Sequence, residues 1–270
     1  MDKINKQTDR PENKDRKRIT LQLITGLFLI FISVTGVIIH KYSEQQQLKK
    51  FQGIAKTRET DVIIPEITMD KEGEDTKESI TFSYDWHSLI DINSDIKGWL
   101  CLPDTPINFP VVGAADNEYY LKHDFWKKEN NVGSPFMDKD TLAWDFNRTI
   151  YAHNMGKSST LMFSAFLNFK DETYFQEHST LYYTECFGTT SEYQVMAVIK
   201  YDARDIEVWD FRTRNHEDEG SRTIWMEKLK ERALYYTEPD HTPEKILTLS
   251  TCDRSEYGKD GRLIVVASKC

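Results

Sequence analysis

The stretch Leu247-Thr-Leu-Ser-Thr-Cys252 and, further along, Gly261-Arg-Leu-Ile-Val-Val-Ala267 are typical of two strands near the end of the chain. Residues 253–261 between them form a connection long enough for antiparallel pairing. In that arrangement Cys252 lies at the same rim of the fold as Arg262. A thiol and a guanidinium at neighbouring strand ends indicate a chemical site, and the question is which other groups join them.

The first of these strands has two different faces. Because side chains alternate with a period of two, one face carries Leu247, Leu249 and Thr251, and the other carries Ile246, Thr248, Ser250 and Cys252. The second face becomes more polar toward Cys252, as expected for the wall of a groove.

Short strands dominate the rest of the folded part. They are expected over 98–102, 107–112, 134–137, 149–152, 180–187 and 192–201. Helical segments are expected over 85–92, 117–124 and 221–236, the last from apolar residues at Trp225, Leu229, Ala233 and Tyr236. Many short strands and few helices predict a mainly β fold, a closed barrel with helical insertions.

A long apolar stretch near the beginning of the chain indicates a membrane anchor. Residues 19–39 carry no charge and would span about 31 Å as a helix, which matches a bilayer core. A cleaved signal peptide would have a shorter apolar region and a small-residue cleavage site. The stretch instead ends in Ile-Ile-His-Lys-Tyr at 38–42, so an uncleaved anchor is expected.

Charge predicts the orientation of this anchor. Residues 1–18 hold seven Lys/Arg against four acidic residues, so they are expected to form a cytoplasmic tail in a single-pass membrane protein. Residues 40–83 are then expected to form an extracellular stalk and linker, and 84–270 an extracellular folded domain. Residues 40–270 contain 28 Lys/Arg and 40 Asp/Glu, a formal charge of −12. An acidic domain argues against a nucleic-acid partner.

Among the cysteines and histidines, Cys252 and His153 are the pair best placed for thiol chemistry. Cys101, Cys186, Cys252 and Cys270 contain no C-x-x-C pair, so neither a zinc ribbon nor a thioredoxin-like motif is present, and no cofactor or metal is expected. Spacing alone leaves their disulfide state open. His153 also follows a predicted strand, 149–152. A thiolate can attack a peptide carbonyl, an imidazole can protonate the leaving amine, and a guanidinium can hold an oxyanion.

These motifs together resemble a known family. Thr248-Leu-Ser-Thr-Cys252, Arg262 ten positions later, the upstream Tyr151-Ala-His153 and the amino-terminal anchor are similar to those of the class B sortases. The resemblance implies a closed eight-stranded barrel with N-terminal helices and a long helix inserted before the last two strands, all preceded by one transmembrane helix.

The resemblance also implies an activity and a set of site residues. Class B sortases are transpeptidases that cut a sorting motif in secreted proteins and pass the acyl group to an amine of a cell-wall precursor or a pilin. By motif match, Cys252 is the nucleophile, His153 the general acid and base, and Arg262 the oxyanion clamp. The substrate contacts implied by the same match are Asn117, Leu121, Tyr151, Ser250 and Asp253. Asp253 stands where many relatives carry Glu.

Two other classes of protein fit the residues. A Cys-His peptidase or amidase would release its product to water and would show no dependence on an added amine. A membrane-tethered binding protein would carry Cys252 only incidentally, and Cys252→Ala would leave it unchanged.

Overall fold

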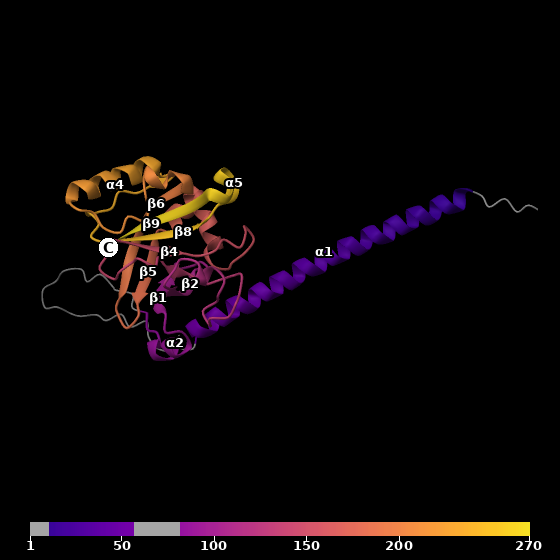
Figure 1. Cartoon of the computed structure of the whole chain (residues 1–270), viewed down its shortest axis with the longest axis horizontal. Helices are drawn as coiled ribbons and strands as arrows, with labels where there is room; N and C mark the ends of the chain where they lie inside the picture. Colours follow the sequence, from indigo (N-terminus) through magenta and orange to yellow (C-terminus); the bar gives the residue numbers. More distant parts are fainter. Residues whose placement is uncertain (1–10, 57–81) are drawn as a thin grey trace, which may run out of the picture. The chain divides into compact units, whose positions relative to one another are not determined.

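The computed structural model describes residues 11–56 and 82–270 (Figure 1), and the chain divides into two compact units after Gln47. All the described residues of the first unit belong to the helix α1 (Pro11–Lys56), whose segment Arg18–Ile39 is long and apolar enough to cross a membrane, with a mean hydropathy of 2.3. It contains the predicted anchor at 19–39. The predicted linker falls mostly on residues outside the described part.

Residues 82–270 carry a barrel and the helices around it. The strands are β1 (Ile96–Cys101), β2 (Asn108–Gly113), β3 (Phe136–Met137), β4 (Asn147–Tyr151), β5 (Thr180–Glu185), β6 (Thr190–Asp202), β7 (Tyr235–Tyr236), β8 (Ile246–Cys252) and β9 (Gly261–Lys269). The α-helices are α2 (Trp86–Ile92), α3 (Glu172–Glu177), α4 (Glu219–Arg232) and α5 (Arg254–Tyr257). The 3₁₀ helices are η1 (Tyr119–Leu121), η2 (Phe163–Lys170), η3 (Ala203–Glu207) and η4 (Gly258–Asp260).

Eight of these strands close on themselves. Their order is β5-β1-β2-β3-β4-β8-β9-β6, and β6 pairs again with β5, while β7 adds to β6 outside the ring. Most neighbours are antiparallel, but β2 pairs with β3 and β4 with β8 in parallel. The closed barrel expected from the resemblance is confirmed. Closure leaves no edge strand in the ring, which removes a site of non-specific pairing.

Strand β9 is buried on both faces, which explains its unbroken apolar sequence. Leu263, Val265 and Ala267 belong to the main core inside the barrel. Ile264 and Val266 belong to a second cluster, which also contains Trp225 and Leu229 of α4. The alternation expected for β8 follows the same rule, since Leu247 and Leu249 lie in the main core and Ile246 in the second cluster.

Helix α4 covers this second cluster beside β6 (Figure 1). Asp218 caps its first turn by accepting a hydrogen bond from the backbone of Ser221 at 2.7 Å. Burying Trp225 and Leu229 contributes about 1.5–3 kcal/mol each. The prediction that the helix runs to Tyr236 is wrong. It ends at Arg232, because the next residues turn extended and Tyr235–Tyr236 pair with β6 as β7.

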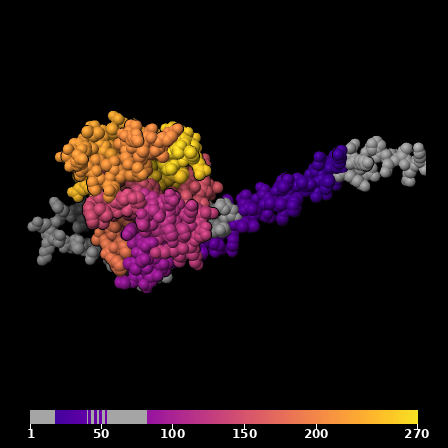
Figure 2. Space-filling model, viewed as in Figure 1, coloured from indigo at the N-terminus to yellow at the C-terminus, as the bar shows by residue number. Residues whose placement is uncertain are grey.

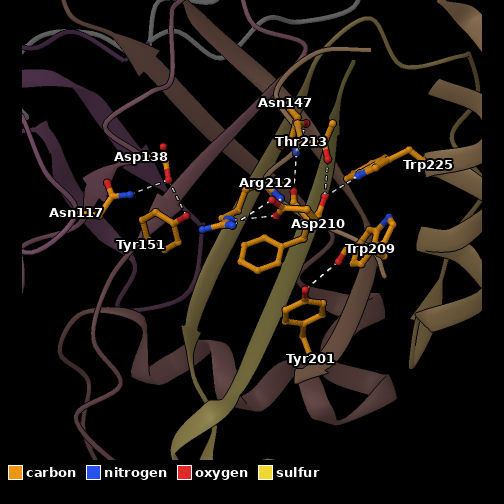
Figure 3. Close-up of polar contacts among 11 residues, drawn as sticks. Asn117, Asp138, Asn147, Tyr151, Tyr201, Trp209, Asp210, Arg212, Thr213 and Trp225 are labelled. Carbon is orange, nitrogen blue, oxygen red and sulfur yellow. Dashed lines mark hydrogen bonds and ion pairs between the residues drawn. The ribbon is translucent and has the colours of Figure 1, made fainter. Parts of the chain in front are cut away.

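The segment between β6 and α4 is tied down through its main chain. The side chains of Tyr201 and Trp225 donate to the carbonyl oxygens of Trp209 and Asp210, at 2.8 and 3.0 Å. Asn147 of β4 donates to the carbonyl of Phe211 at 2.7 Å (Figure 3). In Figure 2 the orange surface, the colour of this segment and of α4, adjoins the yellow surface of the last part of the chain.

Candidate active site

Cys252 and Arg262 occupy facing strand ends. Cys252 is the last residue of β8, Arg262 is the second of β9, and the two are paired in the antiparallel register. Both side chains are half-buried. The register therefore places the thiol and the guanidinium of the opening stretch side by side at one rim of the barrel.

His153 reaches the same rim from the other side of β8. Strands β4 and β8 run parallel, with Tyr151 opposite Ser250, and His153 lies two residues after the end of β4. Its Nε2 lies 2.8 Å from the carbonyl oxygen of Leu121. Because a carbonyl only accepts, Nε2 carries a proton, which leaves Nδ1 as the nitrogen that can take up or release one.

Gly133 allows the neighbouring loop to approach the imidazole. Its φ is +67°, in the region that favours glycine. A Cβ at this position would clash with the carbonyl oxygen of Tyr120 and lie 3.3 Å from Cδ2 of His153. A side chain here would displace the loop that carries Leu121, the residue whose carbonyl orients the His153 ring.

The guanidinium of Arg262 is held by its own strand start. Nη1 donates to the carbonyl oxygens of Lys259 and Gly261, at 3.0 and 2.9 Å. Within residues 11–56 and 82–270 nothing accepts a hydrogen bond from Nε or Nη2 of Arg262. These donors are therefore available to a group bound in front of Cys252.

One cleft of about 430 Å³ collects these side chains. Its lining residues are Asn117, Leu121, Phe136, Tyr151, Ala152, His153, Tyr201, Ala203, Ile206, Phe211, Arg212, Ser250, Thr251, Cys252 and Arg262. Seven of the eight residues expected from the sequence belong to this lining. The parts of the wall at 201–212 come from the end of β6 and the segment after it.

Asp253 is the expected residue that does not line the cleft. Its side chain is 7% exposed and pairs with Lys170 at the end of η2, Oδ2 to Nζ, at 3.0 Å. Burial alone would raise the pKa of the Asp253 carboxyl, but hydrogen bonds from Ser255 and Lys170 outweigh it and hold that pKa below its ordinary value. The structure thus places the Asp253 carboxylate in an ion pair with Lys170, outside the lining of the cleft.

A polar network forms the far wall of the cleft (Figure 3). Asn117 and Tyr151 both donate to Oδ2 of Asp138, at 2.9 and 2.8 Å. Opposite them, Nε and Nη2 of Arg212 donate to the two carboxylate oxygens of Asp210, at 2.9 and 3.1 Å. That pairing, reinforced by nearby Tyr151 and Asp138, raises the pKa of Arg212, so the guanidinium stays charged.

Sequence reasoning missed Arg212. Its local pattern is an Asp two residues before the Arg, and the same pattern recurs at Asp202 and Arg204 with the same fork of hydrogen bonds. Arg204 is not part of the cleft lining. The Asp-x-Arg spacing therefore does not indicate which arginine lines the cleft. Only the three-dimensional path of the chain places Arg212 there and Arg204 elsewhere.

The cysteines in strands or turns elsewhere are unsuited to nucleophilic chemistry. Burial raises the pKa of the Cys101 thiol to about 11 and also raises that of Cys186. Neither lines the cleft, and no disulfide joins Cys101, Cys186 or Cys252. A raised thiol pKa keeps the sulfur protonated at neutral pH, and a protonated thiol is a poor nucleophile.

Comparison with known proteins identifies the family. A family model described as the sortase domain matches residues 100–270. Sortase B of Listeria monocytogenes is 32% identical over 179 residues, which cover 64% of this chain and 69% of the relative. Sortase B of Bacillus anthracis superposes with a TM-score of 0.65 and 27% identity, covering 86% of this chain and 98% of that one. A class B sortase of Streptococcus pyogenes involved in pilus biogenesis gives 0.61 and 26%, with coverages of 69% and 98%.

The chain therefore belongs to the sortase family, within class B, whose members are cysteine transpeptidases. The family acts in general on proteins that carry a sorting signal, together with an amine acceptor.

Proposed function

We propose that this chain cleaves a C-terminal sorting motif of a secreted protein at Cys252 and transfers the acyl group to an amine at the cell surface. In this proposal Cys252 is the nucleophile, His153 the general acid and base, and Arg262 the oxyanion clamp. Asn117, Leu121, Tyr151 and Ser250 line the peptide groove. The observation that carries the proposal is that all three reacting groups line one cleft.

The reaction follows from these positions. The Cys252 thiolate attacks the scissile carbonyl carbon, and the oxyanion accepts hydrogen bonds from Arg262. The C–N bond breaks while the His153 imidazolium gives its proton to the leaving amine, and a thioester remains. A second amine then attacks the thioester and passes a proton to His153. The C–S bond breaks, which releases the new amide and restores the thiolate.

We further propose that residues 19–39 anchor this domain to the membrane. The apolar segment Arg18–Ile39 of α1 and the basic residues before it support a cytoplasmic tail at 1–18, a stalk and linker at 40–83 and an extracellular catalytic domain at 84–270. Protease added to intact wall-stripped cells should then degrade the catalytic domain. Protection until the cells are lysed would contradict this topology.

The transpeptidase proposal is tested with the full chain in detergent micelles. The chain is incubated with a library of sorting-like peptides, with and without an added amine (triglycine or a lysine peptide), and the products are read by mass spectrometry. We expect an acyl adduct on Cys252 and an amine-dependent transfer product, both absent in Cys252→Ala. Release of free acid alone, unaffected by amine, would show a hydrolase. Absence of any adduct would favour the binding protein.

A further inference from the structure

The nucleophile and the imidazole lie on strands far apart in sequence, so non-covalent contacts must set their distance. The backbone ladder between β4 and β8 reaches only as far as Ala152, whose N–H donates to the carbonyl oxygen of Ser250 at 3.3 Å. His153 stands one residue beyond that contact. Its backbone carbonyl instead accepts from Phe163, outside the sheet, at 3.0 Å.

Two side-chain hydrogen bonds continue where the ladder stops. The hydroxyl of Thr251 donates to the carbonyl oxygen of Ala152 at 2.8 Å, and Nδ2 of Asn154 donates to the carbonyl oxygen of Cys252 at 2.8 Å. Ala152 and Asn154 are the two sequence neighbours of His153. The pair of bonds therefore brackets His153 and joins it to the nucleophile and the residue just before it.

Both donors are themselves fixed. Thr251 is 2% exposed, so its hydroxyl has no competing water. Oδ1 of Asn154 accepts a hydrogen bond from the backbone of Gly156 at 2.8 Å, which orients the amide so that Nδ2 points to Cys252. Because the Asn154 amide is hydrogen-bonded through both its oxygen and its nitrogen, it is held in one orientation, and so is the Cys252 carbonyl that it contacts.

We propose that Thr251 and Asn154 are positioning residues, a side-chain clamp that holds the imidazole of His153 against the sulfur of Cys252. The inference rests on the proposed function. The clamp acts on geometry alone, since the sulfur must reach the scissile carbonyl carbon while the imidazole lies within hydrogen-bond distance of the leaving amine. Loss of about 1 Å in such placement costs roughly a hundredfold in rate.

A matched threonine separates this role from ordinary stabilisation. Thr184 of β5 is also 2% exposed and also makes a cross-strand hydrogen bond, which its hydroxyl shares with that of Thr190 at 2.9 Å. It does not line the cleft. Thr184→Val and Thr251→Val therefore remove the same chemical group at the same burial, one away from the site and one beside the nucleophile.

The test compares Thr251→Val, Thr251→Ser, Asn154→Ala and Thr184→Val in the full chain in detergent. We expect Thr251→Val and Asn154→Ala each to lower kcat about ten- to a hundredfold with KM within about twofold. Asn154 lies outside the cleft lining, and Thr251, although in the lining, is 2% exposed and donates its hydroxyl to Ala152. Thr251→Ser keeps the hydroxyl and should recover most of kcat. Thr184→Val should lower the melting temperature as much as Thr251→Val and leave kcat unchanged.

A second readout does not depend on the peptide. The rate at which a methanethiosulfonate reagent modifies Cys252, followed by mass mapping, should fall in Thr251→Val and Asn154→Ala but not in Thr184→Val. Unchanged kcat and unchanged modification in both clamp variants would overturn the proposal, as would an equal loss in Thr184→Val. A wild-type chain that forms no acyl adduct would instead overturn the proposed function. The rates at which Cys252 is modified would then still show whether Thr251 and Asn154 act as positioning residues.

Discussion

Replacing Arg262 by Lys tests whether the guanidinium holds the oxyanion, while keeping the positive charge. In the structure Nη1 of Arg262 is occupied by the carbonyl oxygens of Lys259 and Gly261. This fixes the plane of the fork and leaves Nε and Nη2 for an oxyanion beside Cys252. A lysine ammonium is a single point with three donors, so it cannot hold both carbonyls and direct two parallel donors at the oxyanion.

The size of the effect follows from the number of donors lost. Removal of one preorganised oxyanion donor costs about 10²–10³ in kcat, or about 2.7–4 kcal/mol. We therefore expect Arg262→Lys to lower kcat by at least a hundredfold with little change in KM, because the oxyanion forms only in the transition state.

The assay is peptide cleavage with an added amine, read by mass spectrometry alongside the thioester. Arg254→Lys is the matched control, since Arg254 is exposed in the same β8–β9 connection and outside the cleft lining. Turnover of Arg262→Lys within about fivefold of wild type would refute the assignment. So would an equal loss in the Arg254→Lys control.

Three further predictions concern the surroundings of the site. Asp253→Asn removes the ion pair to Lys170 and should cost about 1–3 kcal/mol at pH 7. Because the folded-state pKa of Asp253 is depressed, this loss should shrink as pH falls below about 4, and a melting-temperature difference that persists there would contradict it. Arg212→Gln should raise KM for the peptide about three- to tenfold with kcat retained, whereas Arg204→Gln should change neither. Alkylation of Cys101 at pH 7 should be at least about a hundredfold slower than in urea-unfolded chain, since burial raises its pKa to about 11.

The parts of the fold that could be predicted are those with strong local patterns. Strands β8 and β9 could be recognised in the sequence because β9 is apolar on both buried faces and because one face of β8 changes from apolar to polar along its length. Their antiparallel register then brought Cys252 beside Arg262 as expected. His153 could be linked to this pair only through its strand-end position and the family motif. The parallel pairing of β4 with β8 is a tertiary fact without a local signature.

The parts that could not be predicted depend on tertiary contacts. The apolar stripe of α4 continues in sequence to Tyr236, but pairing of Tyr235 and Tyr236 with β6 ends the helix early. Helix α3 and the 3₁₀ helix η2 went unrecognised, because a six-residue helix and a 3₁₀ helix give no clear period. The family match implied a substrate contact for Asp253, and this stays a prediction. Its ion pair with Lys170 joins two residues far apart in sequence, so no local pattern could indicate it.

The way in which the cleft wall is attached separates catalysis from substrate choice. The ties to Asp210 and Phe211, from Trp225 and Asn147, all end on main-chain carbonyl oxygens. These ties and the buried rings of Trp209 and Phe211 hold the path of the segment. Arg212 pairs with Asp210 of the same segment, so the side chain at 212 can change without loosening the wall. The reacting groups lie instead just after β4, at the end of β8 and at the start of β9, and the burial of these strands leaves little room for change. We therefore expect substitutions at 212 to change which peptide binds, while substitutions beside Cys252 and His153 change how fast any peptide reacts.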